Sequence, residues 1–461
     1  MDQEADTIAA IATPVGQAGI GIIRISGPEA LKIAKRIFRP RNFLTHFKSH
    51  RLYLGHIYDP NTGLNLDEVL LSYMKAPHTY TREDVVEINS HSGFLLLSKI
   101  LELVIDSGAR LARPGEFTLR AYLNGRIDLT QAEAVIDLIR SRSERGLHLA
   151  SQQIKGVFKE KIYALREKIL EILSHVEAAI DFPEEEDTFL DKGRCLTTIS
   201  GKIIPEVDAL IKAHSEKKIW IDGINTVIAG RVNVGKSSLL NCLLDEQRAI
   251  VTSIPGTTRD IIESSLTIEG IPLRLMDTAG LRKVSDEVEK IGIRLTEQKL
   301  NEADLILAVI DQSEPLTQDD LSLLDQVKDK ATLVVLNKID LPAGMDWDKA
   351  LGHFSSLPVA KVSALTGEGM ESLKKAIVRL VIGQDKDLVS SSIAPNLRQT
   401  RALKQAKHYL MNAAACIESN APLELVALEL KSGLDSLGEI VGETTPEEVL
   451  ENIFSNFCIG K

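Results

Sequence analysis

Apolar positions in the first part of the chain form short runs and helical repeats. The runs Thr7–Thr13, Ile20–Ser26 and Val85–Asn89 have the length of β-strands. Pro28–Phe38 and Phe94–Ile105 carry apolar residues at three- and four-residue steps, which predicts two helices. Strands mixed with helices in this way indicate an α+β domain at the N-terminal end.

A longer helical pattern begins near Leu129. It predicts one long amphipathic helix that ends at Asp181–Pro183, and a second helical stretch from about Cys195 to Ile219. Helical spacing returns from Leu397 to about Phe457. The apolar residues that predict the long helix are Leu147, Ile154, Phe158, Ile162, Leu165, Ile169, Leu173, Val176 and Ile180.

Between these helical stretches, short apolar strands alternate with helices, which is typical of a doubly wound α/β domain with a mostly parallel sheet. The strand candidates are Thr226–Ala229, Leu273–Met276, Leu305–Ile310, Leu333–Leu336 and Val359–Val362. The simplest arrangement inserts this domain between two halves of one helical domain, with two separate helical parts as the alternative. We therefore expect a multidomain α/β plus all-α protein with domains over residues 1–126, 127–222, 223–384 and 385–461.

The composition is that of a globular chain, because 44% of the 461 residues are hydrophobic and 26% are charged, which excludes a disordered or collagen-like protein. No uncharged apolar run approaches the roughly 18 residues of a membrane span, so we expect no membrane protein. Met1–Glu4 lack the basic region of a secretory signal. The cysteines stand far apart without a CxxC pair, which favours a reducing cytosol over zinc or disulfides; they are Cys195, Cys242, Cys416 and Cys458.

The net charge of −11 excludes a protein that coats nucleic acid without specificity. A local basic stretch without a carboxylate remains, and it either contacts RNA phosphates or forms a solvated face. Aromatic residues make up only 4% of the chain, so no base-stacking platform is evident. The basic residues are Lys32, Lys35, Arg36, Arg39, Arg41, Lys48 and Arg51.

The segment Gly230–Ser237 satisfies the phosphate-binding pattern G-x-x-x-x-G-K-[ST], directly after a predicted strand and before a helical run. Its glycines let backbone amides wrap phosphates, Lys236 reaches the β- and γ-phosphates, and Ser237 is placed to bind Mg²⁺. A chance glycine-rich turn is the alternative, and four further motifs argue against it. We expect the nucleotide to be bound by Asn233, Val234, Gly235, Lys236, Ser237 and Ser238.

Four later motifs complete a set that resembles the five guanine-nucleotide motifs of small GTPases. They are Gly256–Asp260 with a switch threonine, Asp277-Thr278-Ala279-Gly280, Asn337-Lys338-Ile339-Asp340 and Ser363-Ala364-Leu365. The Asp340 carboxylate can accept hydrogen bonds from N1 and N2 of guanine, a donor pair that adenine does not present. Since an unpaired buried acceptor discriminates by roughly 10⁴ or more, the base is predicted to be guanine.

The residue after the Asp277–Gly280 motif departs from the Ras pattern. Ras-like GTPases orient the attacking water with a Gln there, whereas this chain has Leu281, which cannot polarise water. Hydrolysis therefore needs another group, and carboxylates are available in Asp286-Glu287-Val288-Glu289. Arg259 and Arg282 lie nearby, but neither is an obvious arginine finger, and a solvated switch helix is the alternative for this region.

Further segments carry a resemblance to one family: Ala112–Thr118, Leu129–Ala134, Ala178–Pro183 and the terminal Phe457–Lys461. With the nucleotide motifs, they make the chain resemble the MnmE (TrmE) tRNA-modification GTPases along its whole length. The resemblance implies a cytoplasmic homodimer with an α+β folate-binding N-terminal domain that dimerises, a split helical domain and an inserted Ras-like G domain. It also implies a complex with the flavoprotein MnmG (GidA), which installs an aminomethyl or carboxymethylaminomethyl group at C5 of the wobble uridine U34 of certain tRNAs.

The resemblance further implies two cation sites beside GTP. Ser237 and Thr258 match Mg²⁺ ligands, while Asn233, Thr252, Ile254 and Thr257 match K⁺ ligands. The K⁺ would neutralise charge in the transition state as an arginine finger does elsewhere. Glu289 matches the carboxylate that positions the water, so it joins Lys236 and Asn233 among the catalytic residues. The loop that binds the cation and the nucleotide is Thr252, Ser253, Ile254, Pro255, Gly256, Thr257 and Thr258.

For the N-terminal domain, the resemblance implies that Arg24, Glu87 and Arg126 contact 5-formyltetrahydrofolate or a related folate, with Lys461 approaching it. These residue types suit a folate, because its glutamate tail binds cations and its pterin binds a carboxylate. Cys458 is the fourth catalytic candidate, as a thiol near the folate, and a small buried packing residue is its alternative. Three positions depart from the family pattern, namely Ser92, Arg126 and Val232.

Two other functions compete with tRNA modification. One is a GTPase switch that binds RNA or the ribosome without modification chemistry, and it predicts an RNA-binding module such as a KH domain with its GXXG loop. The sequence contains no such module that we can identify. The other is a folate-dependent one-carbon enzyme with a regulatory G domain, which overlaps with the modification function.

Overall fold

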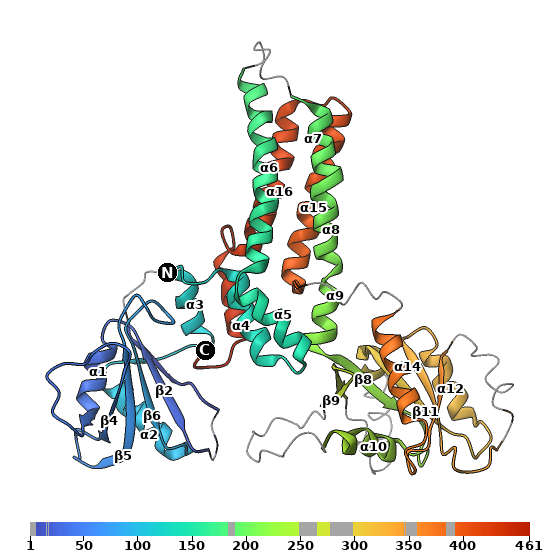
Figure 1. Cartoon of the computed structure of the whole chain (residues 1–461), viewed down its shortest axis with the longest axis horizontal. Helices are drawn as coiled ribbons and strands as arrows, with labels where there is room; N and C mark the ends of the chain where they lie inside the picture. The colour runs from blue at the N-terminus through green and yellow to red at the C-terminus, as the bar shows by residue number, and fades with distance from the viewer. Residues whose placement is uncertain are drawn as a thin grey trace.

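The computed structural model describes residues 6–14, 16, 18–182, 190–248, 265–276, 298–344, 346, 357–383 and 392–461. Two sheet domains lie on either side of the foot of a tall helical bundle (Figure 1). The chain runs from the first sheet domain into the bundle, then through the second sheet domain and back into the bundle. The predicted fold class, an α/β domain inserted in a helical domain after an α+β domain, is confirmed.

The first domain holds a seven-stranded sheet of order β3-β4-β5-β6-β2-β1-β7, antiparallel except where β1 pairs with β7. Helices α1 and α2 share one apolar core with the sheet. The bounds are β1 Ile8–Ile11, β2 Gly21–Ser26, α1 Ala30–Ile37, β3 Phe38–Pro40, β4 Arg51–Tyr58, β5 Asn65–Met74, β6 Val85–Ser90, α2 Phe94–Asp106, β7 Arg110–Leu111 and α3 Glu116–Leu123. The sequence prediction omitted β3, β4, β5 and β7, because none of them forms an uninterrupted apolar run.

The bundle joins helices from both halves of the chain, and α6, α7, α8, α15 and α16 share its main core. The first half contains α4 Leu129–Arg140, α5 Glu144–Ile154, α6 Val157–Asp181, α7 Lys192–Thr198, the π-helical segment η2 Ile199–Ile203, α8 Ile204–Lys212 and α9 His214–Lys217. The second half contains α15 Leu397–Glu418, α16 Leu423–Val441 and α17 Glu447–Ser455. This arrangement explains why the apolar spacing resumes after the inserted domain.

The prediction of one long helix through Leu147 and Ile180 was wrong at one point. The structure ends α5 at Ile154 and begins α6 at Val157, with Gly156 between them at φ +91°. A left-handed residue interrupts a helix, yet the apolar steps continue across it because both helices face packed interiors. The periodicity alone therefore could not reveal the break.

The inserted domain has a six-stranded sheet of order β13-β12-β11-β8-β10-β9, parallel except for the β9–β10 hairpin. All five strands predicted here are present, and β9 is an addition. The bounds are β8 Ile224–Ala229, α10 Lys236–Arg248, β9 Ser265–Ile268, β10 Ile271–Leu275, β11 Leu305–Asp311, α12 Gln318–Val327, β12 Thr332–Asn337, β13 Val359–Lys361 and α14 Met370–Ile382. The proposed domain limit at 126 falls between α3 and α4, and that at 222 falls just before β8.

The joint between bundle and inserted domain is tightly packed. Leu149 of α5 belongs to the core of the inserted domain, beside Trp220 of the π-helical segment η3 Lys218–Asp222. Ser143 Oγ donates a hydrogen bond of 2.6 Å to the Trp220 carbonyl. Lys217 and Asp137 form a buried ion pair at the same place. The inserted domain is thus fixed to the bundle by packing and by charge. Among the described residues, no helix is long and apolar enough to cross a membrane.

A substitution at Gly146 would test how tightly this joint is packed. A Cβ there would lie 2.3 Å from the Trp220 carbonyl oxygen, a backbone atom that cannot move aside cheaply. We expect Gly146→Ala to lower the free energy of unfolding by about 1–3 kcal/mol, as overpacked substitutions do. Thermal unfolding would measure this loss. Gly193→Ala is the matched control, since its Cβ would meet only ordinary contacts in α7, and an equal loss in both variants would contradict the packing argument.

Candidate functional site

The phosphate-binding loop turns sharply between β8 and α10. Gly230 has φ +150°, and a Cβ there would lie 2.3 Å from the carbonyl oxygen of Val309. Gly235 has φ +95°, and its Cβ would lie 2.2 Å from Nδ2 of Asn337. Asn233, between them, is also left-handed at φ +68°. The loop therefore requires glycine at both ends, because no side chain fits the space.

Lys236 begins α10 and folds back over the loop. Its Nζ donates to the carbonyls of Gly230 at 2.7 Å and Arg231 at 2.6 Å. Burial lowers the pKa of Lys236, since it disfavours the charged ammonium. An ammonium has three donors, so one stays available for a phosphate oxygen.

Asn337 connects three of the predicted motifs. It ends β12 with 2% exposure, and its Nδ2 donates to the Val234 carbonyl at 2.9 Å. Its Oδ1 accepts from the backbone N–H of Ala364 at 3.0 Å. Ser363 Oγ donates to Asp340 Oδ1 at 2.5 Å. The structure thus brings the phosphate loop and both base-binding motifs together at the carboxyl ends of the parallel strands, where such sheets bind ligands.

Asp311, at the end of β11, was missed by the sequence prediction. Lys338, in a left-handed conformation at φ +66°, donates from Nζ to Asp311 Oδ2 at 2.5 Å. Ser313 donates to Asp311 Oδ1 from its N–H and Oγ. Burial opposes ionisation of this carboxyl, but the hydrogen bonds from Lys338 and Ser313 outweigh it and lower its pKa. The sequence signal that could have identified Asp311 is an acidic residue at the end of a predicted strand.

The other predicted nucleotide-site residues are either exposed on the loop and α10 or lie outside the described residues. Asn233, Ser237 and Ser238 are exposed on the loop and at the start of α10. The remainder lie outside the described residues; they are Thr252, Ser253, Ile254, Pro255, Gly256, Thr257, Thr258, Asp277, Thr278, Ala279, Gly280 and Glu289.

Three predicted folate residues meet on the first sheet. Arg24 of β2 and Glu87 of β6 are cross-strand partners, joined by a 2.8 Å ion pair. The Arg24 guanidinium lies 5.9 Å from the ring centre of Tyr80 and 5.7 Å from that of Phe117. Arg126 lies 4.7 Å from the same Tyr80 ring and donates to the Tyr80 carbonyl at 3.1 Å. Two arginines therefore lie against one aromatic side chain, and a carboxylate pairs with one of the arginines.

The C-terminal tail reaches this cluster. The carbonyl of Gly460 accepts from Arg24 Nη1 at 3.4 Å, and that of Lys461 accepts from the Phe117 N–H at 3.2 Å. Figure 1 shows this end of the chain beside α3. The structure thus brings Lys461 to Arg24. The side chain of Cys458 is exposed after α17, whereas the packing alternative expects it to be buried.

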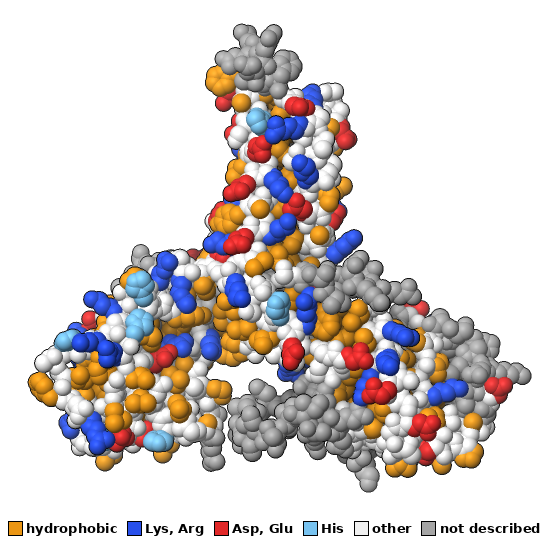
Figure 2. Space-filling view, in the orientation of Figure 1, with side chains coloured by type: hydrophobic (Ala, Val, Ile, Leu, Met, Phe, Trp, Pro, Cys, Tyr) orange, Lys and Arg blue, Asp and Glu red, His pale blue; other side chains and the backbone are white. Residues whose placement is uncertain are grey.

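The basic stretch of the first domain has many local partners. Lys32 pairs with Glu29, and Arg36 donates to the carbonyl of Ser107. Arg39 stacks on Tyr58, with 3.8 Å from its guanidinium to the ring centre. Figure 2 shows Lys and Arg side chains scattered over this domain among apolar and acidic ones. These contacts favour the interpretation of a solvated face over that of an RNA site.

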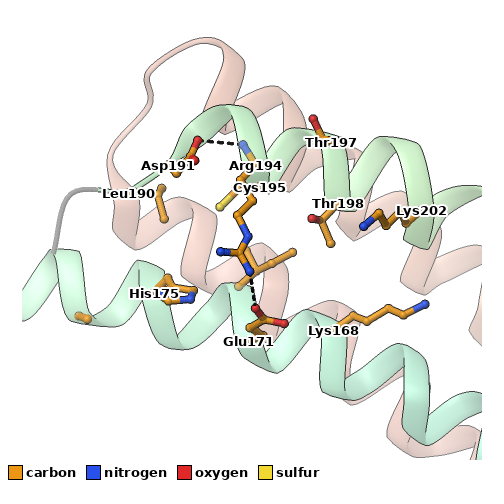
Figure 3. Close-up of a pocket in the computed structure, with 12 residues that line it drawn as sticks. Lys168, Glu171, His175, Leu190, Asp191, Arg194, Cys195, Thr197, Thr198 and Lys202 are labelled. Atoms are coloured by element: carbon orange, nitrogen blue, oxygen red, sulfur yellow. Dashed lines mark hydrogen bonds and ion pairs between the residues drawn. The ribbon is translucent and has the colours of Figure 1, made fainter. Parts of the chain in front are cut away.

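A cavity of about 540 Å³ lies in the bundle between α6 and the α7–η2 segment (Figure 3). Arg194 reaches across it to Glu171 at 3.0 Å, and Asp191 accepts from the backbone N–H of Arg194. Burial raises the pKa of the Cys195 thiol in its wall. None of its lining residues is a predicted site residue. Among the residues that the structure describes, no group of three or more His, Cys, Asp or Glu could hold a metal ion.

Two family models match the chain: the GTP-binding protein TrmE N-terminus over residues 7–126 and the MnmE helical domain over residues 129–458. A relative named tRNA modification GTPase MnmE from Geobacillus kaustophilus is 45% identical over 460 residues, 99% of this chain and 100% of its own. Another of that name from Thermoanaerobacter pseudethanolicus is 47% identical over 458 residues, 99% of each. The chain belongs to the MnmE family of tRNA modification GTPases.

Membership of this family establishes the general activity, GTP hydrolysis in tRNA modification. The solved G domain of the T. maritima FeoB iron transporter is also similar, at 30% identity over 34% of this chain and 98% of its own, with a TM-score of 0.26. The phosphate loop, Asn337 and the Asp340–Ser363 pair are the parts of the described structure that suit binding of GTP.

Asp340 tests the base preference. Replacing its carboxylate in Asp340→Asn should weaken GTP binding by roughly 10- to 100-fold, because hydrogen bonds to a charged acceptor are lost. Xanthine nucleotides should gain in relative affinity, since their base pairs with an amide instead. Titrations with GTP, XTP and ATP would measure this, with the exposed Asp329→Asn as control. Equal ATP and GTP affinity in the unaltered chain would contradict a guanine site.

Proposed function

We propose that this GTPase acts with the flavoprotein MnmG on C5 of U34 in certain tRNAs. It works in the cytoplasm as a homodimer joined through the N-terminal domain, and the pair adds an aminomethyl or carboxymethylaminomethyl group. The carbon unit comes from 5-formyltetrahydrofolate or a related folate. Residues 1–126, 127–222, 223–384 and 385–461 are the proposed domains.

The observation that carries this proposal is the return of the C-terminal tail to the first sheet. Arg24 and Arg126 supply cations for a glutamate tail, and Glu87 supplies an acceptor for pterin N–H groups. The Tyr80 ring, which lies near both guanidinium groups, offers a surface for a flat pterin. Cys458 is exposed two residues before Gly460, whose carbonyl contacts Arg24, and its own carbonyl accepts a hydrogen bond from the Gly115 N–H at 3.5 Å. A plain GTPase switch does not account for such a cluster.

The nucleotide site supports the proposed cations through its donor types. Ser237 is an exposed hydroxyl at the start of α10, suited with Thr258 to Mg²⁺, which prefers oxygen ligands. Asn233 is an exposed amide on the loop, suited with Thr252, Ile254 and Thr257 to K⁺. The cation supplies positive charge beside the phosphates. Glu289 positions the water that Leu281 cannot orient.

The test of the modification function is mass spectrometry of U34 in tRNA from a strain that lacks this chain. Wild-type protein should restore the modified U34, whereas Cys458→Ser should leave U34 unmodified and keep GTP hydrolysis nearly intact. Serine is almost isosteric with cysteine, so an unchanged melting temperature excludes a folding defect. If U34 still carries the modification in the deletion strain, the proposed function is rejected in favour of an RNA- or ribosome-binding switch. Normal modification of U34 by the Cys458→Ser variant would reject only the role of the thiol.

The cation proposal has a separate test. Hydrolysis should be faster in KCl than in NaCl at equal ionic strength by on the order of tenfold or more, the scale of lost transition-state charge stabilisation. Rb⁺ and NH₄⁺ should replace K⁺ because their radii are similar. Asn233→Ala should remove the difference, while Asn241→Ala on the exposed side of α10 should keep it. Identical turnover in both salts would refute the K⁺ site.

A further inference from the structure

The side chain of Arg231, in the phosphate loop, points toward the segment after β11 and contacts two carboxylates there. It forms an ion pair with Glu314, and its Nε lies 3.5 Å from Oδ2 of Asp320 in the first turn of α12. The Asp320 side chain is 1% exposed, that of Arg231 is 22% exposed and that of Glu314 is 55% exposed. One of the two contacts is therefore buried and the other is open to water.

The buried contact contains unsatisfied polar atoms. Arg231 Nε and Asp320 Oδ1 are both buried without a hydrogen-bond partner among the described residues. Asp320 Oδ2 accepts from the N–H and Oγ of Thr317, which caps α12. Leaving a buried polar group unpaired costs about 1–3 kcal/mol, so such atoms in a native protein call for an explanation.

The hydrogen bonds that Asp320 makes in the capping box of α12 do not require its charge. Thr317 is the N-cap residue, and Asp320 accepts from the Thr317 N–H through a side-chain oxygen of a kind that asparagine also has. A buried carboxylate, by contrast, is costly unless a cation compensates it, and Arg231 is the cation that the structure places beside it. Asp320 thus faces two sources of positive charge, the N-terminal end of α12 and the guanidinium of Arg231, and only the guanidinium is a full charge.

The backbone of Arg231 also contacts the phosphate-binding lysine. The carbonyl of Arg231 accepts from Lys236 Nζ at 2.6 Å. A shift of the Arg231 backbone therefore shifts the ammonium group. A displacement of about 1 Å of a catalytic group can reduce the reaction rate by roughly 100-fold. A fixed position of the Arg231 carbonyl therefore favours fast hydrolysis.

We propose that Arg231 is a positioning residue for GTP hydrolysis, held by Asp320 and Glu314 so that its carbonyl keeps Lys236 directed at the phosphates. Asp320 is the principal support, because its charge is shielded from water and Glu314 is half exposed. The guanidinium lies 3.5 Å from Asp320 Oδ2, and the neighbouring Oδ1 has no other partner among the described residues, so the full charge of this carboxylate is available to hold the arginine. This role is independent of the proposed cation and folate sites and depends only on the GTPase activity.

A double-mutant cycle tests the proposal. The variants are Arg231→Gln, Asp320→Asn and the pair together, and the measurements are GTP dissociation constant, GTP turnover at saturation and melting temperature. Asparagine keeps an oxygen to cap α12 and removes the charge that faces Arg231. We expect each single variant to weaken GTP binding and to slow turnover, together by roughly 5- to 50-fold, and the double variant to be no worse than the poorer single one. Asp325→Asn, an exposed acid on the same helix, is the matched control and should leave both unchanged.

Two outcomes would overturn the proposal. In one, the losses in GTP binding multiply in the double variant, which means that the two residues act separately. In the other, the melting temperature falls while GTP binding and turnover stay normal, which means that the contact is only structural. If Asp320→Asn fails to fold, Arg231→Lys and Glu314→Gln give the answer. Lysine keeps the charge and loses the planar fork, so it should lose GTP affinity, and Glu314→Gln should lose less than Arg231→Lys. Normal GTP binding in Arg231→Lys would reject the positioning role.

Discussion

The buried side-chain amide of Asn337 is the contact on which the nucleotide site depends. It ends a strand that is fixed between two neighbours, so the amide has no freedom to move. Its donor holds the phosphate loop at Val234, and its acceptor holds the base loop at Ala364. The close approach is possible only because Gly235 has no side chain, since a Cβ there would collide with the amide. One amide therefore sets the distance between the phosphate and base ends of a bound nucleotide.

A second constraint holds the C-terminal tail against the first sheet, at the proposed folate site. Gly460 has φ +93°, and a Cβ there would lie 2.4 Å from the carbonyl oxygen of Ile11 in β1. The aromatic rings of Phe454 and Phe457 stack with centres 5.3 Å apart and are buried against the foot of the bundle. Burying two such side chains contributes several kcal/mol, which offsets the entropy of ordering the tail. The tail thus packs against both the foot of the bundle and the first sheet.

The sequence predicted well where one physical rule dominates. The strands of the inserted domain, such as Leu305–Asp311, are buried on both faces and read as continuous apolar runs. The strand Arg51–Tyr58 is half exposed and mixes polar residues with apolar ones, so it was missed. Arg24 and Glu87 could be assigned to one site only through the resemblance, and their pairing was not predicted, because nothing local shows that residues so far apart are cross-strand neighbours. Asp320 was invisible for the same reason, since its partner lies in a loop from another part of the chain.

The two sites lie on domains that have the bundle in common. The phosphate loop follows β8, which begins just after the segment that contains Trp220, and this segment packs on α5. The tail site connects to the same foot of the bundle, because Tyr122 donates to the carbonyl of Gly442 at the end of α16. Among the described residues, the packed contacts that join the inserted domain to the tail site run through this foot. Since close-packed interiors transmit strain, the joint at Gly146 and the ion pair of Lys217 with Asp137 lie where strain from the inserted domain would enter the bundle.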